Sequence, residues 1–144
     1  MDVGGSGISN EPDENGDDLM KAREFYEKVA ERSMLSKEEA TDLTRAVLET
    51  LALRLSPGEA HDLAAQLAEP LAEPVEQNAK GPERFRLPEL IRRVSARTGL
   101  NEAETTAGVR AVLITLREAI DANEFDDVMA QLPNDFAQLL EPAS

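Results

Sequence analysis

The chain has 144 residues, the size of one compact domain, and a formal net charge of −14 at pH 7. Such an acidic chain argues against binding to the phosphate backbone of nucleic acids, which requires positive charge. It contains no cysteine and a single histidine, His61, which excludes disulfides, thiolate chemistry and cysteine-based metal sites. No apolar run approaches the roughly 18 residues needed to span a bilayer.

Residues 1–17 are predicted to form a disordered acidic tail, because glycines, aspartates and glutamates leave almost nothing apolar to bury. The segment up to Asp18 has neither a basic start nor an apolar stretch, so we do not expect a secretory signal. Residues 18–144 are predicted to form a single helical domain of a cytoplasmic protein.

That domain is internally repeated at an offset of about 65 residues. Roughly seventeen of about forty-four paired positions are identical, far above the one in ten to twenty expected by chance. The sequence Arg-Ala-Val-Leu, for example, occurs at residues 45–48 and again at 110–113. The repeat is informative about the fold and says little about chemistry.

Each copy is predicted to contain three helices, because apolar residues recur at the spacing of an amphipathic helix. In repeat one (residues 18–68), capping boxes are expected at Ser36 with Glu39 and at Ser56 with Glu59, and they start the second and third helices.

Repeat two (residues 87–132) has Asn101 and Asp121 in place of the two serines, and both residue types cap helices well. Three prolines and a glycine between the repeats predict a linker over residues 69–86, with at most one helical turn. A short C-terminal helix is expected at 134–140.

Val47, Leu51, Val112 and Leu116 are predicted to lie in a core built by both repeats, because one repeat alone would be marginal. The predicted fold is therefore all-α: two tandem three-helix repeats packed into one helical bundle, related by an approximate two-fold axis or by a translation.

The recurring residues also carry a family resemblance. The pattern comprises Phe25, Val29, Arg32, Leu35, Glu39, residues 45–51, residues 55–60, Asp62-Leu63 and Gln66-Leu67, and it returns in the second copy as far as Pro133. Over roughly Leu19 to Leu140 the chain resembles the bacterial family catalogued as domain of unknown function 2267. The resemblance implies a small, all-helical, two-repeat protein, and it implies no activity, cofactor or catalytic residue.

Two arginine–aspartate pairs recur at one spacing, Arg45 with Asp62 and Arg110 with Asp127. We interpret them as bridges between the second and third helices of each repeat, and a small-anion site formed by the arginines is the alternative.

Two further pairs of polar residues recur near helix ends. Arg32 and Arg97 are expected to interact with the helix macrodipole, because they lie in the last turns of the first helices. Gln66 and Gln131 are expected to bond open carbonyls at the ends of the third helices.

Arg84, Arg86, Arg92 and Arg93 form a local basic cluster. We expect an exposed face that docks onto an acidic surface of a partner or of a second copy. The alternative is that basic and acidic patches offset each other within the bundle.

Residue types for catalysis or metal binding are scarce. His61 alone cannot supply the Glu-x-x-His motifs of di-iron bundles, no glycine-rich phosphate loop occurs, and Asp126-Asp127 lacks an EF-hand loop. We therefore predict no catalytic residue, cofactor or metal ligand, although a carboxylate-only site for Mg²⁺ or Ca²⁺ stays open.

The leading hypothesis is a non-enzymatic protein-interaction or scaffolding module with an unidentified protein partner, binding neither nucleic acid nor membrane, in an oligomeric state that the sequence leaves open. A closed interface between the repeats would favour it. A pocket lined by Arg45 and Arg110 would favour a module for a small anion or an apolar ligand. Two close carboxylates with a raised pKa in a cleft would favour a carboxylate-dependent enzyme.

Overall fold

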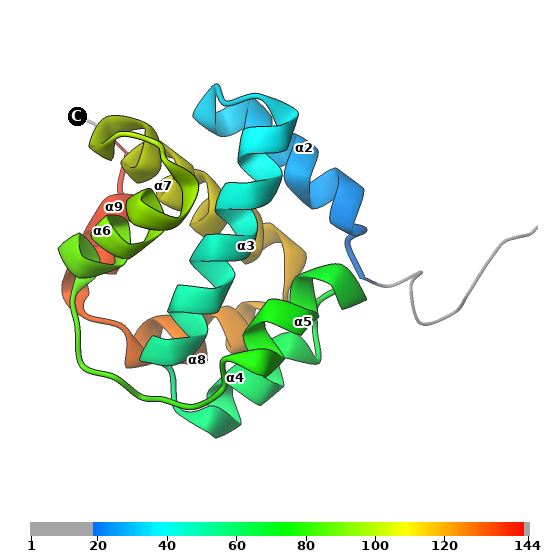
Figure 1. Ribbon diagram of the computed structural model, residues 1–144. Helices are drawn as coiled ribbons and strands as arrows, with labels where there is room; N and C mark the ends of the chain where they lie inside the picture. The colour runs from blue at the N-terminus through cyan, green and yellow to red at the C-terminus, as the bar shows by residue number, and fades with distance from the viewer. Residues whose placement is uncertain (1–18, 143–144) are drawn as a thin grey trace, which may run out of the picture.

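The computed structural model describes residues 19–142, and every regular element among them is an α-helix (Figure 1). The predicted all-α class is confirmed, while the acidic tail predicted at residues 1–17 lies outside the described residues. The helices are α2 (Ala22–Ser33), α3 (Lys37–Arg54), α4 (Pro57–Ala64), α5 (Glu69–Gln77), α6 (Leu87–Thr98), α7 (Glu102–Ala119), α8 (Ala122–Gln131) and α9 (Asn134–Leu140).

Each repeat contains four helices rather than three. The helices α2 to α5 and α6 to α9 begin at equivalent positions of the two copies, namely Ala22 and Leu87, Lys37 and Glu102, Pro57 and Ala122, and Glu69 and Asn134. The prediction of three-helix repeats joined by a linker over residues 69–86 is therefore wrong at this point. The first half of that linker is α5, and the expected C-terminal helix is the equivalent fourth helix of repeat two.

Helix α5 forms despite its two prolines. Pro70 lies in the first turn, where a backbone N–H has no intrahelical acceptor. Pro74 removes one helical hydrogen bond, but Leu71, Ala72 and Val75 are buried where α5 packs on α3 and α4. Burial of this apolar face outweighs the poor helix propensity of the two prolines. The sequence pattern alone does not show that this face is buried.

The first helix of each repeat packs on the second helix of the other repeat. Helix α2 lies on α7, α6 lies on α3, and α4 contacts α8 (Figure 1). Such reciprocal contacts relate the repeats by an approximate two-fold axis rather than a translation. The arginines in the last turns of α2 and α6 also contact the opposite repeat. Arg32 pairs with Glu118 on α7 at 2.7 Å, and Arg97 pairs with Glu49 on α3.

At the crossing of the two central helices, α3 and α7, a glycine faces a leucine. Leu43 and Gly108 occupy equivalent positions of the repeats, and a Cβ atom on Gly108 would lie 2.4 Å from Cδ1 of Leu43. Two leucines would collide here, and two glycines would leave a cavity. The repeats have therefore diverged into complementary shapes where they meet.

Buried apolar side chains of both repeats form a single core. Val47, Leu51, Val112 and Leu116 belong to it and are at most 1% exposed, which confirms that prediction. Within residues 19–142, no helix has both the length and the apolar composition needed to cross a membrane.

We expect Gly108→Leu to lower the free energy of unfolding by about 1–3 kcal/mol, because it overpacks the crossing against the fully buried Leu43. The matched control is Gly58→Leu, since nothing lies within 4 Å of a Cβ atom placed there, and its effect should stay within about 0.5 kcal/mol. Chemical denaturation measures both, and equal stability of the two variants would contradict the close crossing.

Candidate functional site

Arg45 and Arg110 contact the fourth helix of their own repeat. Arg45 lies 3.5 Å from Glu49 and 3.7 Å from Glu73, which is on α5. Arg110 donates from Nε to the carbonyl oxygen of Leu139, on α9, at 3.1 Å. Both arginines therefore contact helices that the sequence interpretation did not place on this face.

The bridges predicted from Arg45 to Asp62 and from Arg110 to Asp127 are consequently wrong. The two aspartates lie on α4 and α8, which contact each other across the repeats. Arg110 lines a shallow depression at the start of α7 whose walls do not include Arg45. The alternative of an anion site shared by the two arginines therefore has no support from this geometry.

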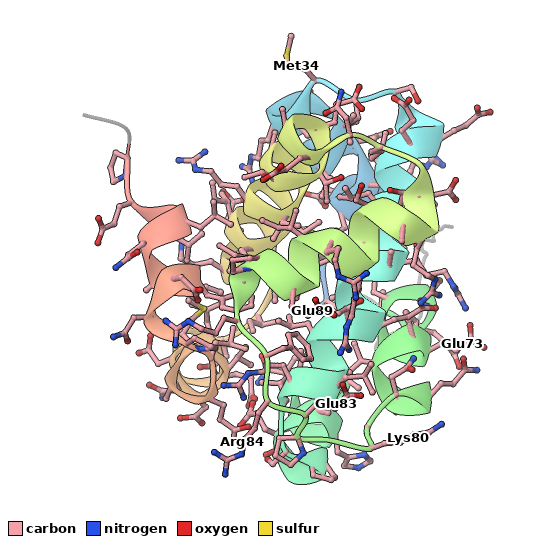
Figure 2. The ribbon with its side chains drawn as sticks, turned by 60° about the vertical axis from the view of Figure 1, so that its left-hand side comes forward. Met34, Glu73, Lys80, Glu83, Arg84 and Glu89 are labelled. Carbon is pink, nitrogen blue, oxygen red and sulfur yellow. The ribbon has the colours of Figure 1, made fainter. Side chains whose placement is uncertain are left out.

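The basic face predicted from the sequence consists of Arg84, Arg86, Arg92 and Arg93. Arg92 and Arg93 both donate to Glu89, at 2.7 and 2.8 Å, and these hydrogen bonds lower the pKa of Glu89 to about 2. Arg86 lies 3.5 Å from Asp135. Acidic and basic side chains are thus interspersed around Arg86, Arg92 and Arg93 (Figure 2), as the alternative of offsetting patches expects. Arg84 is exposed and forms no ion pair with the described residues, and docking of this face onto an acidic surface stays a prediction.

Gln66 and Gln131 join the two repeats reciprocally. Oε1 of Gln66 accepts from the backbone N–H of Asp121 at 2.7 Å, and Oε1 of Gln131 accepts from that of Ser56 at 2.8 Å. Ser56 and Asp121 are the N-caps of α4 and α8. The amides were expected to donate to open carbonyls, but Nε2 of Gln131 donates to Oγ of Ser56 at 3.2 Å. Both side-chain oxygens accept from N-caps, because the two-fold packing brings the N-cap of the other repeat within reach.

These glutamines change the role of a glutamate. In α3, Oε1 of Glu39 accepts from the N–H of Ser36 at 3.0 Å and completes the predicted capping box. In α4, the equivalent N–H of Ser56 is bonded to Gln131, so the predicted box with Glu59 forms only in its serine half. The carboxylate of Glu59 is therefore released from capping.

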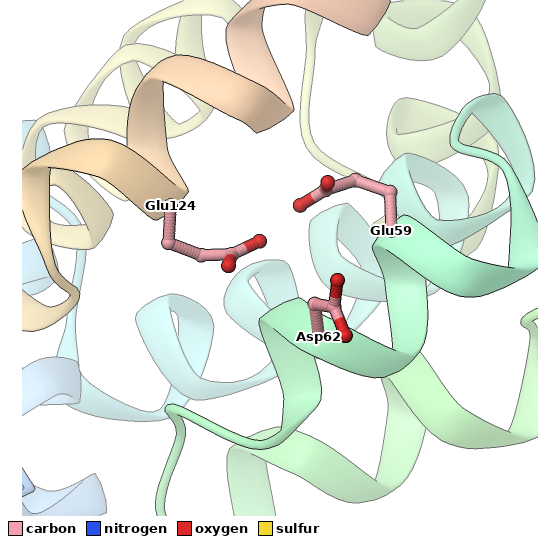
Figure 3. Close-up of side chains that lie close together, drawn as sticks. All are labelled: Glu59, Asp62 and Glu124. Atoms are coloured by element: carbon pink, nitrogen blue, oxygen red, sulfur yellow. The ribbon is translucent and has the colours of Figure 1, made fainter.

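Glu59 and its equivalent Glu124 instead point toward each other between α4 and α8, with Asp62 beside them (Figure 3). Each of these three residues places a carboxylate oxygen within 4.8 Å of the others. We call Glu59, Asp62 and Glu124 the carboxylate site. Because Asp127 is the equivalent of Asp62 and acts on the same group, both repeats contribute the same residue types.

The electrostatics of the carboxylate site are uncompensated. Burial raises the pKa of Glu59 to about 8, together with a side-chain hydrogen bond to Glu124 and the nearby carboxylates of Glu124, Asp127 and Asp62. None of the ion pairs formed within residues 19–142 involves these four side chains. With both groups ionised, Oε2 of Glu59 and Oε2 of Glu124 are buried without a hydrogen-bond partner. Such a group can take up a proton or a cation.

Sequence reasoning missed this site. The available signal is the recurrence of Glu-x-x-Asp at residues 59–62 and 124–127. The interpretation assigned the first glutamate to a capping box and both aspartates to arginines, and it had no reason to bring the third helices of the two repeats together.

The fold and the site define a duplicated, all-helical bundle with a cluster of carboxylates where its halves meet. The family described as an uncharacterized conserved protein (DUF2267) matches residues 22–139, and the chain belongs to this family. The resemblance seen in the sequence is thereby confirmed. No curated protein matches the chain.

In chelator-containing buffer, we expect the free energy of unfolding to fall as the pH rises from about 5 to about 8. Because the pKa of Glu59 is raised to about 8 in the folded chain, the folded state keeps a proton that the unfolded state has lost in this range, and stability decreases with pH.

Glu59→Gln should flatten this dependence, whereas Asp126→Asn should preserve it, since Asp126 is exposed and does not act on Glu59. Denaturation curves at several pH values measure the effect. A flat profile for the parent chain would contradict the electrostatic description of the site.

Proposed function

We propose that the protein is a non-enzymatic interaction module that acts in the cytoplasm and binds a helical segment of another protein. Recurring polar residues support this proposal through the contacts that they already make. Gln66 and Gln131 cap helices across the repeats, and Arg32 and Arg97 pair with carboxylates across the same interface. These side chains are thus occupied in joining the two repeats. A partner would therefore contact the outer faces of the helices.

The observation that carries the proposal is an apolar depression of about 390 Å³ beside α6. Its walls are formed by Leu87, Pro88, Ile91, Arg92, Ser95 and Glu102. Leu87 and Ile91 lie one turn apart and are only partly buried. This spacing suits the apolar face of an amphipathic helix, which docks through residues at intervals of three and four.

Charge indicates the chemistry of that helix. Glu102 forms no ion pair with other described residues, whereas Arg92 is already paired with Glu89. In a chain of net charge −14, a partner helix with basic residues beside its apolar face would be complementary. Complementary charge mainly speeds association and sets orientation.

The equivalent surface of repeat one is different. Tyr26 stands at the position of Ile91, and Lys37 stands at the position of Glu102, where it pairs with Glu27 at 3.5 Å. One ion pair thus replaces the free carboxylate of repeat two. The divergence restricts the proposed docking surface to one repeat and favours one partner helix per chain.

A carboxylate-dependent enzyme is the second candidate, and one observation favours it. Glu59 lies against Glu124 and, with a pKa of about 8, could donate a proton near neutral pH. The depressions beside α6, at the start of α7 and at the start of α3 are lined by other residues. The observation therefore supplies a proton donor that belongs to none of these three depressions.

We expect Ile91→Arg to weaken partner binding more than tenfold, because it places a charge in the apolar depression. Met34→Arg is the matched control, since Met34 is 89% exposed and protrudes beyond the end of α2 (Figure 2). A photo-crosslinking residue at position 91 or 34, introduced in the native cell, identifies the partner, and titration of the purified pair measures affinity. Identical crosslinking from both positions, or equal affinity of both variants, would refute the proposed surface.

A further inference from the structure

We propose that Glu59, Asp62 and Glu124 bind one hard divalent cation of the size of Ca²⁺ between the two repeats. Their carboxylate oxygens lie within 4.8 Å of one another. Oxygens bind Ca²⁺ at about 2.3–2.6 Å, so two ligands on opposite sides of the ion lie about 5 Å apart. For Mg²⁺, bound at about 2.0–2.1 Å in near-ideal octahedral geometry, the same separation is only about 4.2 Å. Separations of up to 4.8 Å are within the reach of Ca²⁺, whose coordination is also more flexible, so we assign the larger ion.

Glu59 provides an observation independent of the clustering. Its side chain is only 9% exposed, it points into the space between α4 and α8 (Figure 3), and its Oε2 atom has no hydrogen-bond partner. Oε2 of Glu124, on the facing helix, is also buried without a hydrogen-bond partner. When both carboxyls are ionised, these two buried oxygens have neither a donor nor a counter-charge, and a bound cation supplies the missing partner.

The site is built by the fold rather than scattered on an acidic surface. Glu59 and Glu124 occupy the third positions of α4 and α8, where Glu39 and Glu104 of α3 and α7 reach back to their N-caps. Glutamine oxygens of the opposite repeat accept from the N-caps of α4 and α8 instead. Because the glutamines take the place of Glu59 and Glu124 at the N-caps, both glutamate side chains are free to turn toward the contact between α4 and α8.

The ligand set selects the class of metal. All three ligands are carboxylate oxygens, which suit Ca²⁺, Mg²⁺ and Mn²⁺ rather than the metals that prefer thiolate or imidazole. Asp62 is exposed, so the site opens to solvent, and water can complete the coordination. Asp127 adds a fourth negative charge nearby.

Calorimetric titration of the full chain with CaCl₂, in buffer of about 0.15 M ionic strength that screens diffuse attraction, tests the proposal. One saturable ion per chain is expected, together with a higher melting temperature, because the ion binds the folded state. Glu59→Gln keeps the shape of the side chain and removes one carboxylate ligand from a crowded acidic site, so this variant should fold and bind Ca²⁺ more than tenfold more weakly. Asp126→Asn removes an exposed charge of α8 outside the site and should leave the affinity unchanged.

A second variant disturbs the site without removing a ligand. Gln131→Ala frees the N–H of Ser56, to which Glu59 can then return as a capping residue. We expect weaker Ca²⁺ binding from this change, and no effect from Gln77→Ala, which alters an exposed glutamine of α5.

Two results would overturn the proposed site: no saturable binding at millimolar Ca²⁺, Mg²⁺ or Mn²⁺, or equal weakening by Glu59→Gln and Asp126→Asn, which would indicate attraction by net charge alone. Tighter binding of Mg²⁺ than of Ca²⁺ would overturn the assignment of the ion's size.

Discussion

The close crossing of α3 and α7 is the constraint on which the rest of the structure depends. Leu43 on one helix fits against the bare backbone of Gly108 on the other, and a single Cβ atom there would enter the leucine side chain. Because α4 follows α3, and α8 follows α7, after only two residues, the crossing also fixes where the third helices meet. The glutamine caps and the facing glutamates both follow from that meeting.

The N-termini of α3 and α7 are capped within the helix, whereas those of α4 and α8 also contact a glutamine of the opposite repeat. Comparing the two shows what the glutamine contacts contribute. A capping box satisfies the helix end locally, as at Ser36 and Asn101, and an N-cap is worth about 1 kcal/mol. At α4 and α8 the cap comes from the opposite repeat, which couples the repeats but leaves two carboxylates buried without donors. Ionising both carboxyls in this place costs more than a cap contributes. Stability alone therefore does not explain the arrangement, and a bound cation would.

The repeats have kept the glutamine contacts that join them, but they differ at the Leu43–Gly108 crossing and on an outer face. Gln66 and Gln131 are identical and make equivalent bonds, whereas Ile91 stands on α6 where α2 carries Tyr26. A contact that is made twice, once in each direction, requires the same residues in both repeats, whereas Leu43 and Gly108 meet only once and can differ. An outer face has no such requirement, so one copy can acquire an apolar depression while the other closes the same surface with an ion pair.

The sequence by itself determined the helical class, the repeat, the central helices with their capping boxes, and the core positions, because periodicity and capping are local properties. It also identified the family. The tertiary structure decided the fourth helix of repeat one, since burial of Leu71 and Val75 overrides two prolines. It decided the partners of the arginines as well, because recurrence of a pair in sequence does not show which faces meet. The carboxylate site belongs wholly to this second group: Glu59 and Glu124 are far apart in the chain, and only the two-fold packing of the repeats, which exchanges the glutamine caps, turns them toward each other.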